Sequence, residues 1–152
     1  MTSIANIVGV DNLASDDGAK QIYGLDWTRF YSPAPLCVVF PKSIEIVQAL
    51  VLFACKNGIS LVPSGGRTGL SGGAVARNGE VVVSFEKMNQ VLEFDAIDQV
   101  VTVQPGVVTE ALQQFADEQG LFYPVDFASA GSSQIGGNLA TNAGGIKVLQ
   151  YG

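Results

Sequence analysis

Glycine is concentrated in two short windows, and this distribution constrains the fold more than any other feature of the sequence. Ten of the 18 glycines lie in windows 65–73 and 131–145. Glycine loses more backbone entropy on folding than other residues, so such clusters suit places that need a positive φ or a close backbone approach. Neither window contains Asp or Glu, although the net charge of the chain is −6. We interpret both windows as loops that present hydrogen-bond donors to an anion.

The polar residues of the windows suit a pyrophosphate, whose oxygens accept hydrogen bonds. No Gly-Lys pair is present for a P-loop, and the spacing of residues 65–70 breaks the GxGxxG pattern of a Rossmann turn, so another kind of loop is expected. Flexible surface loops or tight turns are the alternative interpretation, which the presence of two acid-free clusters disfavours. The neutral or cationic donors are Arg67, Thr68, Ser71, Ser132, Ser133, Asn138, Thr141 and Asn142.

Composition and charge exclude several classes of protein. The chain has 152 residues, 47% of them hydrophobic and 14% charged, which is enough apolar mass for one compact domain and excludes disorder. The net charge of −6 argues against a nucleic-acid partner, which would require clustered Lys and Arg. No apolar run approaches the ~20 residues of a membrane helix. Histidine is absent, which excludes a zinc enzyme or a Ser/His/Asp hydrolase for this stretch.

The N-terminus and the cysteines indicate in which cellular compartment the protein is expected. The first ten residues lack the basic and apolar regions of a signal peptide. Cys37 and Cys55 lie in apolar runs without CxxC spacing, so we expect two reduced, buried core thiols. The expected location is the cytoplasm, with peripheral attachment to a membrane kept as an option for the complete protein.

The hydrophobic pattern predicts a small parallel β-α-β unit followed by further strands and a second helix. Gly58 and Gly120 are placed to end the two helices, and Thr109 is the expected N-cap of the second. Residues 1–22 are expected to contain a short helix and 23–35 an irregular arm, whose Trp27, Phe30 and Tyr31 should pack on their own domain rather than stack on a ligand ring. We expect strands over 36–40, 59–63, 81–85, 91–94 and 100–103, and helices over 42–57 and 109–119. The expected apolar faces are Ile46, Val47, Leu50, Val51 and Ala54 in the first helix and Ala111, Leu112, Phe115 and Ala116 in the second.

Several motifs, in order along the chain, resemble the FAD-binding domain of the vanillyl-alcohol oxidase / p-cresol methylhydroxylase (PCMH) family. VPSGGRTGLSGGA (62–74) resembles its first pyrophosphate loop, and SSQIGGNLATNAGG (132–145) resembles its second signature. VTVQPGVVTEAL (101–112) and PKSIEIVQAL (41–50) are similar to its strand-turn-helix and strand-to-helix junctions. Asp26-Trp27-Thr28 resembles the arm of the D-2-hydroxyacid dehydrogenase branch.

The resemblance implies an α+β fold of the PCMH type. A small parallel β-α-β subdomain is followed by a second, mixed or antiparallel α+β subdomain, and FAD lies between them. We expect an N-terminal helix and arm over 1–35 and an incomplete FAD-binding domain over 36–152. Because relatives continue with a substrate cap domain, we interpret the chain as a C-terminally truncated fragment, from deliberate shortening or a truncated gene product. Self-association through the truncated face is expected.

The resemblance also implies the cofactor site, but neither a catalytic residue nor a metal ligand within this chain. The first window would wrap the pyrophosphate through backbone amides, a Pro-Gly turn would lie near the adenosine, and the second window would line the ribityl chain and flavin ring. Relatives that attach FAD covalently in this domain use a histidine in or near the first loop. This sequence has no histidine, so we expect FAD that can dissociate. The implied cofactor-binding residues are Gly65, Gly66, Arg67, Thr68, Gly69, Leu70, Ser71, Pro105, Gly106, Gly131, Ser132, Gly136, Gly137, Asn138, Thr141, Asn142, Gly144 and Gly145.

The activity implied for the complete protein is oxidation of a D-2-hydroxy acid of the D-lactate, glycolate or D-2-hydroxyglutarate type. Hydride would pass to flavin N5, and a quinone, a cytochrome or an electron-transfer flavoprotein would take the electrons, whereas the fragment alone would be inactive. Two alternatives stay open at this point. One is a catalytically inactive nucleotide-binding or scaffold fragment, and the other is an alcohol or sugar-lactone oxidase of the same superfamily.

Overall fold

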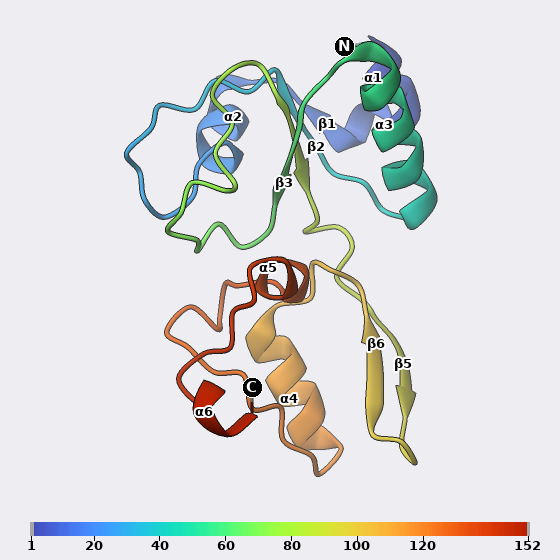
Figure 1. Cartoon of the computed structure of the whole chain (residues 1–152). Helices are drawn as coiled ribbons and strands as arrows, with labels where there is room; N and C mark the ends of the chain where they lie inside the picture. Colours follow the sequence, from blue (N-terminus) through green and yellow to red (C-terminus); the bar gives the residue numbers. More distant parts are fainter. Residues whose placement is uncertain (1, 152) are drawn as a thin grey trace. The chain divides into compact units, whose positions relative to one another are not determined.

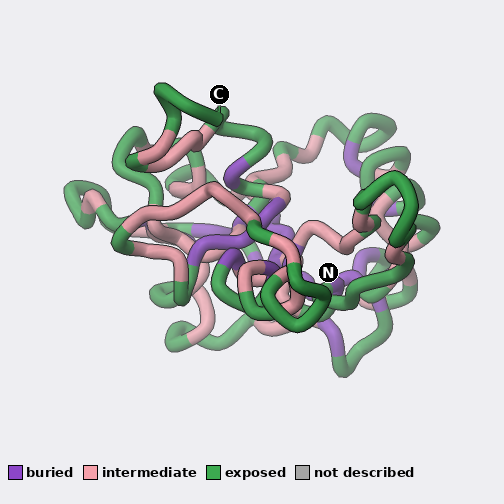
Figure 2. Tube along the Cα trace, turned by 90° about the horizontal axis from the view of Figure 1, so that it is seen from below, coloured by how far each residue is buried: buried purple, intermediate pink, exposed green. Residues whose placement is uncertain are grey.

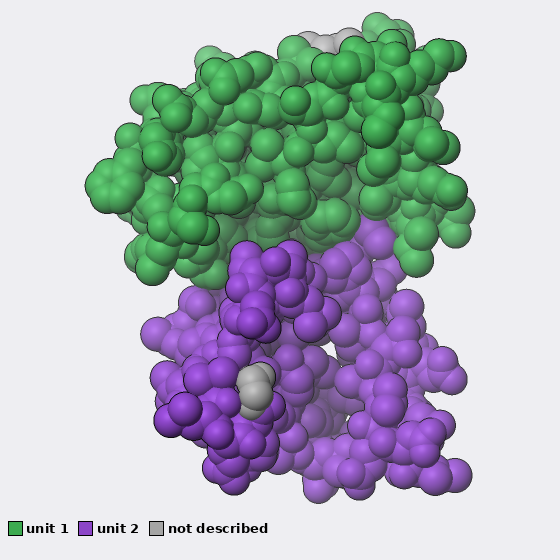
Figure 3. Space-filling view, in the orientation of Figure 1, with its two compact units in different colours: residues 1–87 green, residues 88–152 purple. Residues whose placement is uncertain are grey.

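The computed structural model describes residues 2–151 and divides into two compact units, residues 1–87 and 88–152 (Figure 3). Met1 and Gly152, the outer ends of the predicted domains, lie outside the described residues. The predicted division at residue 35 stays a prediction. Within residues 2–151, none of the helices has the length and apolar content needed to cross a membrane.

The first unit contains a four-stranded sheet in the order β1-β2-β4-β3 (Figure 1). The strands β2 and β3 both run parallel to β4, whereas β1 pairs with β2 in the antiparallel sense. Helix α3 connects β2 to β3, which confirms the predicted parallel β-α-β unit. The strands are β1 (Leu13–Ala14), β2 (Cys37–Val39), β3 (Leu61–Ser64) and β4 (Val81–Ser84), and the helices are α1 (Thr2–Val8), α2 (Asp17–Tyr23) and α3 (Ile44–Asn57), with a 3-10 turn at Val10–Asn12.

Both faces of this sheet are covered, which explains why β2 and β4 are continuous apolar runs rather than alternating ones. On one face, Val39 and Val81 pack with residues of α1 and α3, including Ile4 and Leu50. On the other face, Val38, Phe40, Ala76 and Val82 form a second cluster, against which Tyr23 of α2 packs. Figure 1 shows α1 and α3 on one side of the sheet and α2 on the other, and the buried segments are purple in Figure 2.

Helix α3 has the predicted ends but not the predicted burial. The Ser43 hydroxyl accepts a hydrogen bond from the Ile46 N–H, and Gly58 ends the helix with φ +65°. Leu50 and Ala54 are buried, as expected, but Val51 is 42% exposed. The prediction that Cys55 is a core thiol is wrong, since Cys55 is exposed while Cys37 is buried. Cys55 is one residue past the buried Ala54, so the helical rotation of about 100° per residue carries it to the solvent side.

The second unit contains an antiparallel hairpin and three helices. Its core consists of Val107, Leu112 and Ile135, with Phe115 and Tyr123 packed against them. Gly120 follows the first of these helices with φ +69°, as predicted, but Ala111 of the expected apolar face is exposed. The elements are β5 (Val91–Asp95), β6 (Val100–Val103), α4 (Thr109–Glu118), α5 (Ile135–Ala140) and α6 (Val148–Tyr151).

The prediction that Thr109 caps α4 is wrong. Val108 occupies the N-cap position without a side-chain hydrogen bond, and Thr109 is the first helical residue. The Thr109 hydroxyl is fully buried, lies 2.7 Å from the Ser133 hydroxyl and accepts a hydrogen bond from the Asn138 side-chain amide at 2.7 Å. Ser133 and Asn138 therefore bind the Thr109 hydroxyl, which the sequence pattern had assigned to capping the helix.

Candidate functional site

The first glycine window lies at the carboxyl end of the parallel sheet in the first unit. It begins directly after Ser64, the last residue of β3, which pairs with Ser84 at the end of β4. In open parallel sheets, ligands bind outside the carboxyl ends of the strands. The sheet topology thus places the window where a ligand is expected.

Most backbone N–H groups of this window have no partner within the described part of the chain. From Gly65 to Ser71, none of the seven amides donates a hydrogen bond to another of residues 2–151, and the first that does is Gly72. Arg67 has φ +57°, a left-handed conformation that is uncommon for a residue with a side chain. Alternation of ordinary and left-handed residues lets successive N–H groups converge on an anion. These amides are therefore free to donate, and their role in binding an anion stays a prediction.

Ser64 adds a buried hydroxyl beside these amides. Its side chain is fully buried, and its Oγ has no hydrogen-bond partner among residues 2–151. A buried hydroxyl without a partner costs about 1–3 kcal/mol, so native structures rarely keep one unless a ligand or water satisfies it. Sequence analysis did not select Ser64, because a serine at a strand end has no distinctive sequence signal. The loop amides therefore suit a phosphate-bearing ligand, and the Ser64 hydroxyl, unpartnered among residues 2–151, belongs to the residue directly before them.

The Arg67 side chain is held against its own unit. Its guanidinium lies 4.6 Å from the centre of the Tyr23 ring, and its Nη1 donates a hydrogen bond to the Gly65 carbonyl. The Tyr23 hydroxyl donates to a Glu86 carboxylate oxygen at 2.8 Å. Burial and this neighbouring carboxylate raise the pKa of Tyr23. Since the arginine side chain already has partners, the backbone of the window, rather than its one cation, is the exposed donor surface.

The arm before β2 is fastened to the window by one main-chain and one side-chain hydrogen bond. The Trp27 N–H donates to the Gly69 carbonyl, and the Gly72 N–H donates to the Asp26 carboxylate. The prediction that the arm aromatics pack on their own domain is wrong for Trp27, which is 61% exposed, and for Phe30, which is 85% exposed. Because these hydrogen bonds hold the arm in place, its aromatic rings do not have to pack against the unit. The window is acid-free in sequence, but the fold brings the Asp26 carboxylate to it.

The second glycine window, in the second unit, is largely occupied by its own contacts. The Gly136 N–H donates to the Pro105 carbonyl at 2.8 Å, so the structure brings these two predicted site residues together. A side chain at Gly136 would place its Cβ 2.6 Å from the Pro105 Cβ, and one at Gly145 would overlap the Asp126 backbone. Close packing therefore explains these two glycines without a ligand.

The polar side chains of the second window are also engaged. Asn138 donates to Thr109 in the buried network described above, and the Thr141 hydroxyl donates to the Gly137 carbonyl. Among residues 2–151, the amides of Gly131, Gly137, Gly144 and Gly145 have no acceptor. The amides that donate to carbonyls within the unit include those of Ser132, Ser133, Ile135, Gly136, Asn138, Thr141, Asn142 and Ala143.

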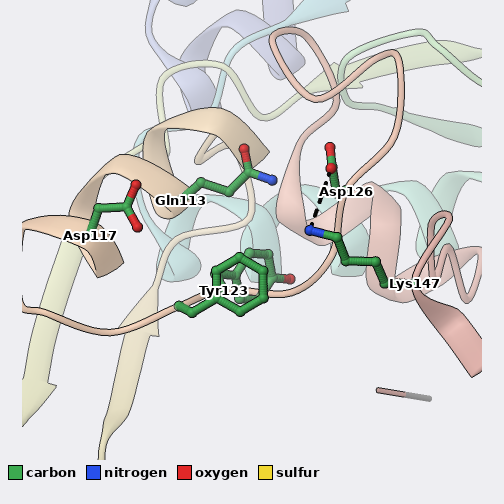
Figure 4. A pocket seen from close by; sticks show the side chains of 6 residues that line it. Gln113, Asp117, Tyr123, Asp126 and Lys147 are labelled. Atoms are coloured by element: carbon green, nitrogen blue, oxygen red, sulfur yellow. Dashed lines mark ion pairs between the residues drawn. The ribbon is translucent and has the colours of Figure 1, made fainter. Parts of the chain in front are cut away.

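A separate hollow in the second unit, shown in Figure 4, has a volume of about 220 Å³. Its lining includes Lys147, whose Nζ lies 3.7 Å from an Asp126 carboxylate oxygen and 4.7 Å from the Phe122 ring centre. Burial raises the pKa of Tyr123, another lining residue. None of the predicted cofactor residues lines this hollow, and its cation is already paired with a carboxylate.

Comparison with known proteins identifies relatives of the chain. Residues 35–152 match the model of a family described as FAD binding domain. The chain is 60% identical over 149 residues to a D-2-hydroxyglutarate dehydrogenase of Stutzerimonas stutzeri (strain A1501), a match that covers 98% of the chain and 32% of that protein. The chain thus spans about a third of the length of this curated relative.

Solved structures share the fold. An alkyldihydroxyacetonephosphate synthase structure matches all of the chain, and 34% of its own chain, with a TM-score of 0.88 and 25% identity. A p-cresol methylhydroxylase structure matches 91% of the chain, and 28% of its own, with a TM-score of 0.75 and 21% identity. These similarities confirm the predicted fold class, an α+β domain of the PCMH type with a parallel β-α-β part and a second part containing an antiparallel hairpin.

Proposed function

The chain belongs to the FAD binding domain family, whose cofactor is FAD, and on that premise we propose that it is the FAD-binding part of an oxidoreductase acting on a D-2-hydroxy acid. The observation that carries the proposal is the run of seven amides, Gly65 to Ser71, that lack acceptors within residues 2–151. They follow β3 directly, whose last residue, Ser64, has a buried hydroxyl without a hydrogen-bond partner among residues 2–151. These donors would bind the diphosphate bridge of FAD, whose charge favours convergent amides.

The other cofactor contacts are proposed from the same resemblance. The amides of Gly65, Gly66, Arg67, Thr68 and Gly69 would hold the diphosphate, with Leu70 and Ser71 beside them. Pro105 and Gly106 would lie near the adenosine. In the second window, the amides of Gly131, Gly137, Gly144 and Gly145, which lack acceptors within residues 2–151, would be donors toward the ribityl chain and flavin ring, whereas Gly136 and Asn138 would shape that side through their packing.

The cofactor would be bound without a covalent bond. The sequence contains no histidine, Cys37 is buried, and Cys55 lies on α3 rather than in either glycine window. When bound, FAD accepts a hydride from a substrate C–H bond. This chain's own part is to bind and orient that cofactor, and a substrate-binding residue is not assigned within it.

The substrate class is proposed from the relative that is 60% identical, whose name specifies D-2-hydroxyglutarate. In the holoenzyme, D-2-hydroxyglutarate should bleach the oxidised flavin absorption under anaerobic conditions, whereas L-2-hydroxyglutarate should not. Bleaching by primary alcohols or sugar lactones instead would contradict the substrate proposal while preserving the cofactor assignment.

Gly69→Asp tests the binding loop directly. A Cβ at Gly69 meets no atom within 4 Å, so a side chain fits there without displacing the fold. A carboxylate at this place would repel the diphosphate, and we expect FAD affinity to fall by about tenfold or more, since about 1.4 kcal/mol corresponds to a factor of ten. Fluorescence titration with FAD gives the dissociation constant.

Gly69→Asn is the matched control, because it has the same shape and no charge. It should retain FAD affinity within about threefold, a difference below 1 kcal/mol. Equal FAD affinities for the Asp and Asn variants would show that the diphosphate does not lie in this window.

A further inference from the structure

Asp26 connects the N-terminal arm to the first glycine window across 46 residues of sequence. Its side chain is 5% exposed, and its two carboxylate oxygens have different partners. Oδ1 accepts hydrogen bonds from the Thr28 N–H at 2.9 Å and the Thr28 hydroxyl at 2.6 Å. Oδ2 accepts a hydrogen bond from the Gly72 N–H at 2.7 Å. One buried carboxylate therefore fixes the turn of the arm and an amide of the loop together.

Two backbone hydrogen bonds lie on either side of this contact. The Trp27 N–H donates to the Gly69 carbonyl and the Ala76 N–H donates to the Gly24 carbonyl, both at 3.0 Å. The arm is thus hydrogen-bonded to the window at Gly69 and Gly72, and to the chain just beyond the window at Ala76. Gly72 has φ +79°, so the chain turns where Oδ2 holds it. The run of amides without acceptors ends at this residue.

We propose that Asp26 is a positioning residue for FAD binding: it holds the loop in the conformation that presents the amides of residues 65–71 to the diphosphate. The inference rests on the proposed function, because it concerns the same loop. Hydrogen bonds to a charged acceptor are about twice as strong as neutral ones, which suits the carboxylate to this task. Asparagine cannot replace it, because the amide has one acceptor oxygen and would turn a donor toward Thr28 or Gly72.

If only the charge of Asp26 mattered, the opposite change in FAD affinity would be expected. A carboxylate near a diphosphate repels it, so if Asp26 acted only through its charge, removing that charge would strengthen FAD binding. If Asp26 positions the loop, Asp26→Asn weakens FAD binding, although it removes a negative charge. The direction of the change in affinity therefore separates the two roles.

The experiment compares the complete protein that carries this chain with its Asp26→Asn variant. Loss of a hydrogen bond to a charged group corresponds to about tenfold to hundredfold in an equilibrium constant, so we expect the FAD dissociation constant to rise by that factor. The Gly72 amide should exchange with solvent about tenfold faster in the FAD-free variant. At saturating FAD, the ³¹P resonances of the bound diphosphate should shift toward those of free FAD, a change that altered stability alone does not produce.

Asp95→Asn is the matched control. The Asp95 carboxylate also accepts hydrogen bonds from two backbone amides, those of Ile97 and Asp98. It does so at the turn between β5 and β6, away from the glycine window in sequence. It should leave FAD affinity and Gly72 exchange unchanged. If Asp26→Asn does not fold, Asp26→Ser replaces it, because a serine hydroxyl can accept from Thr28 but has no second oxygen to reach Gly72.

The outcomes separate this inference from the proposed function. Absence of FAD binding by the unsubstituted complete protein would overturn the proposed function and this inference with it. FAD affinity that is unchanged or higher in a folded Asp26 variant would overturn the inference alone, as would unaltered exchange of the Gly72 amide.

Discussion

At the scale of single residues, the glycines of this chain serve different physical purposes that the sequence cannot distinguish. Gly69 has open space around its Cα, whereas Gly136 is pressed against Pro105. Both lie in windows that composition alone assigned to one ligand. Local composition singled out the first loop, whose amides from Gly65 to Ser71 lack acceptors within residues 2–151, and its role as a cofactor site stays a prediction. It could not locate Asp26 or Ser64, because their roles depend on contacts made after folding.

Gly136 and Gly137 provide a paired test of this distinction. Gly136→Ala should lower the free energy of unfolding by about 1–3 kcal/mol, because the added methyl meets the Pro105 ring and backbone. Gly137→Ala, with nothing within 4 Å of the new Cβ, should raise it by about 0.5–1 kcal/mol, because alanine favours a helix. Urea unfolding measures both. Equal effects of the two substitutions would contradict the packing explanation for Gly136.

At the scale of elements, the sequence predicts best where a segment has its own signals. The strands β2 and β4 are unbroken apolar runs, and α3 has a serine N-cap and a terminal glycine, so their positions follow from local pattern. Helix α5 was not predicted, because its first turn contains two glycines that disfavour a helix. Tertiary hydrogen bonds start it instead: the Ile135 N–H donates to Val107 and the Gly136 N–H donates to Pro105.

The two cysteines test the positions of α3 and β2. Cys55 is exposed on α3, whereas Cys37 is buried in β2 and its burial raises the pKa of its thiol. A thiol reagent reacts with the thiolate, so the raised pKa and the lack of access both slow Cys37 at neutral pH. We expect one thiol to react rapidly in the native chain and the second only after denaturation, and Cys55→Ser to remove the fast phase. Two fast phases would contradict the assigned burial.

At the scale of the whole molecule, the chain combines a parallel β-α-β unit and a hairpin-containing unit, each with its own core. The fold class followed from the sequence because the family motifs occur in order and the apolar runs are long. The hairpin leaves Leu92 57% exposed and Ile97 92% exposed, an arrangement that hydrophobic pattern alone did not predict. Self-association through exposed apolar surface stays a prediction, since such surfaces favour contacts with other chains.

The central claim is that the amides of residues 65–71 form the diphosphate site, and amide NMR with FAD tests it most directly. Adding FAD to the ¹⁵N-labelled chain should shift the amide signals of residues 65–71 and broaden or protect them, because these amides gain an acceptor. The amides of Ser133 and Thr141, which already have carbonyl acceptors, should move much less. Saturable FAD binding that leaves the signals of residues 65–71 in place would contradict the account.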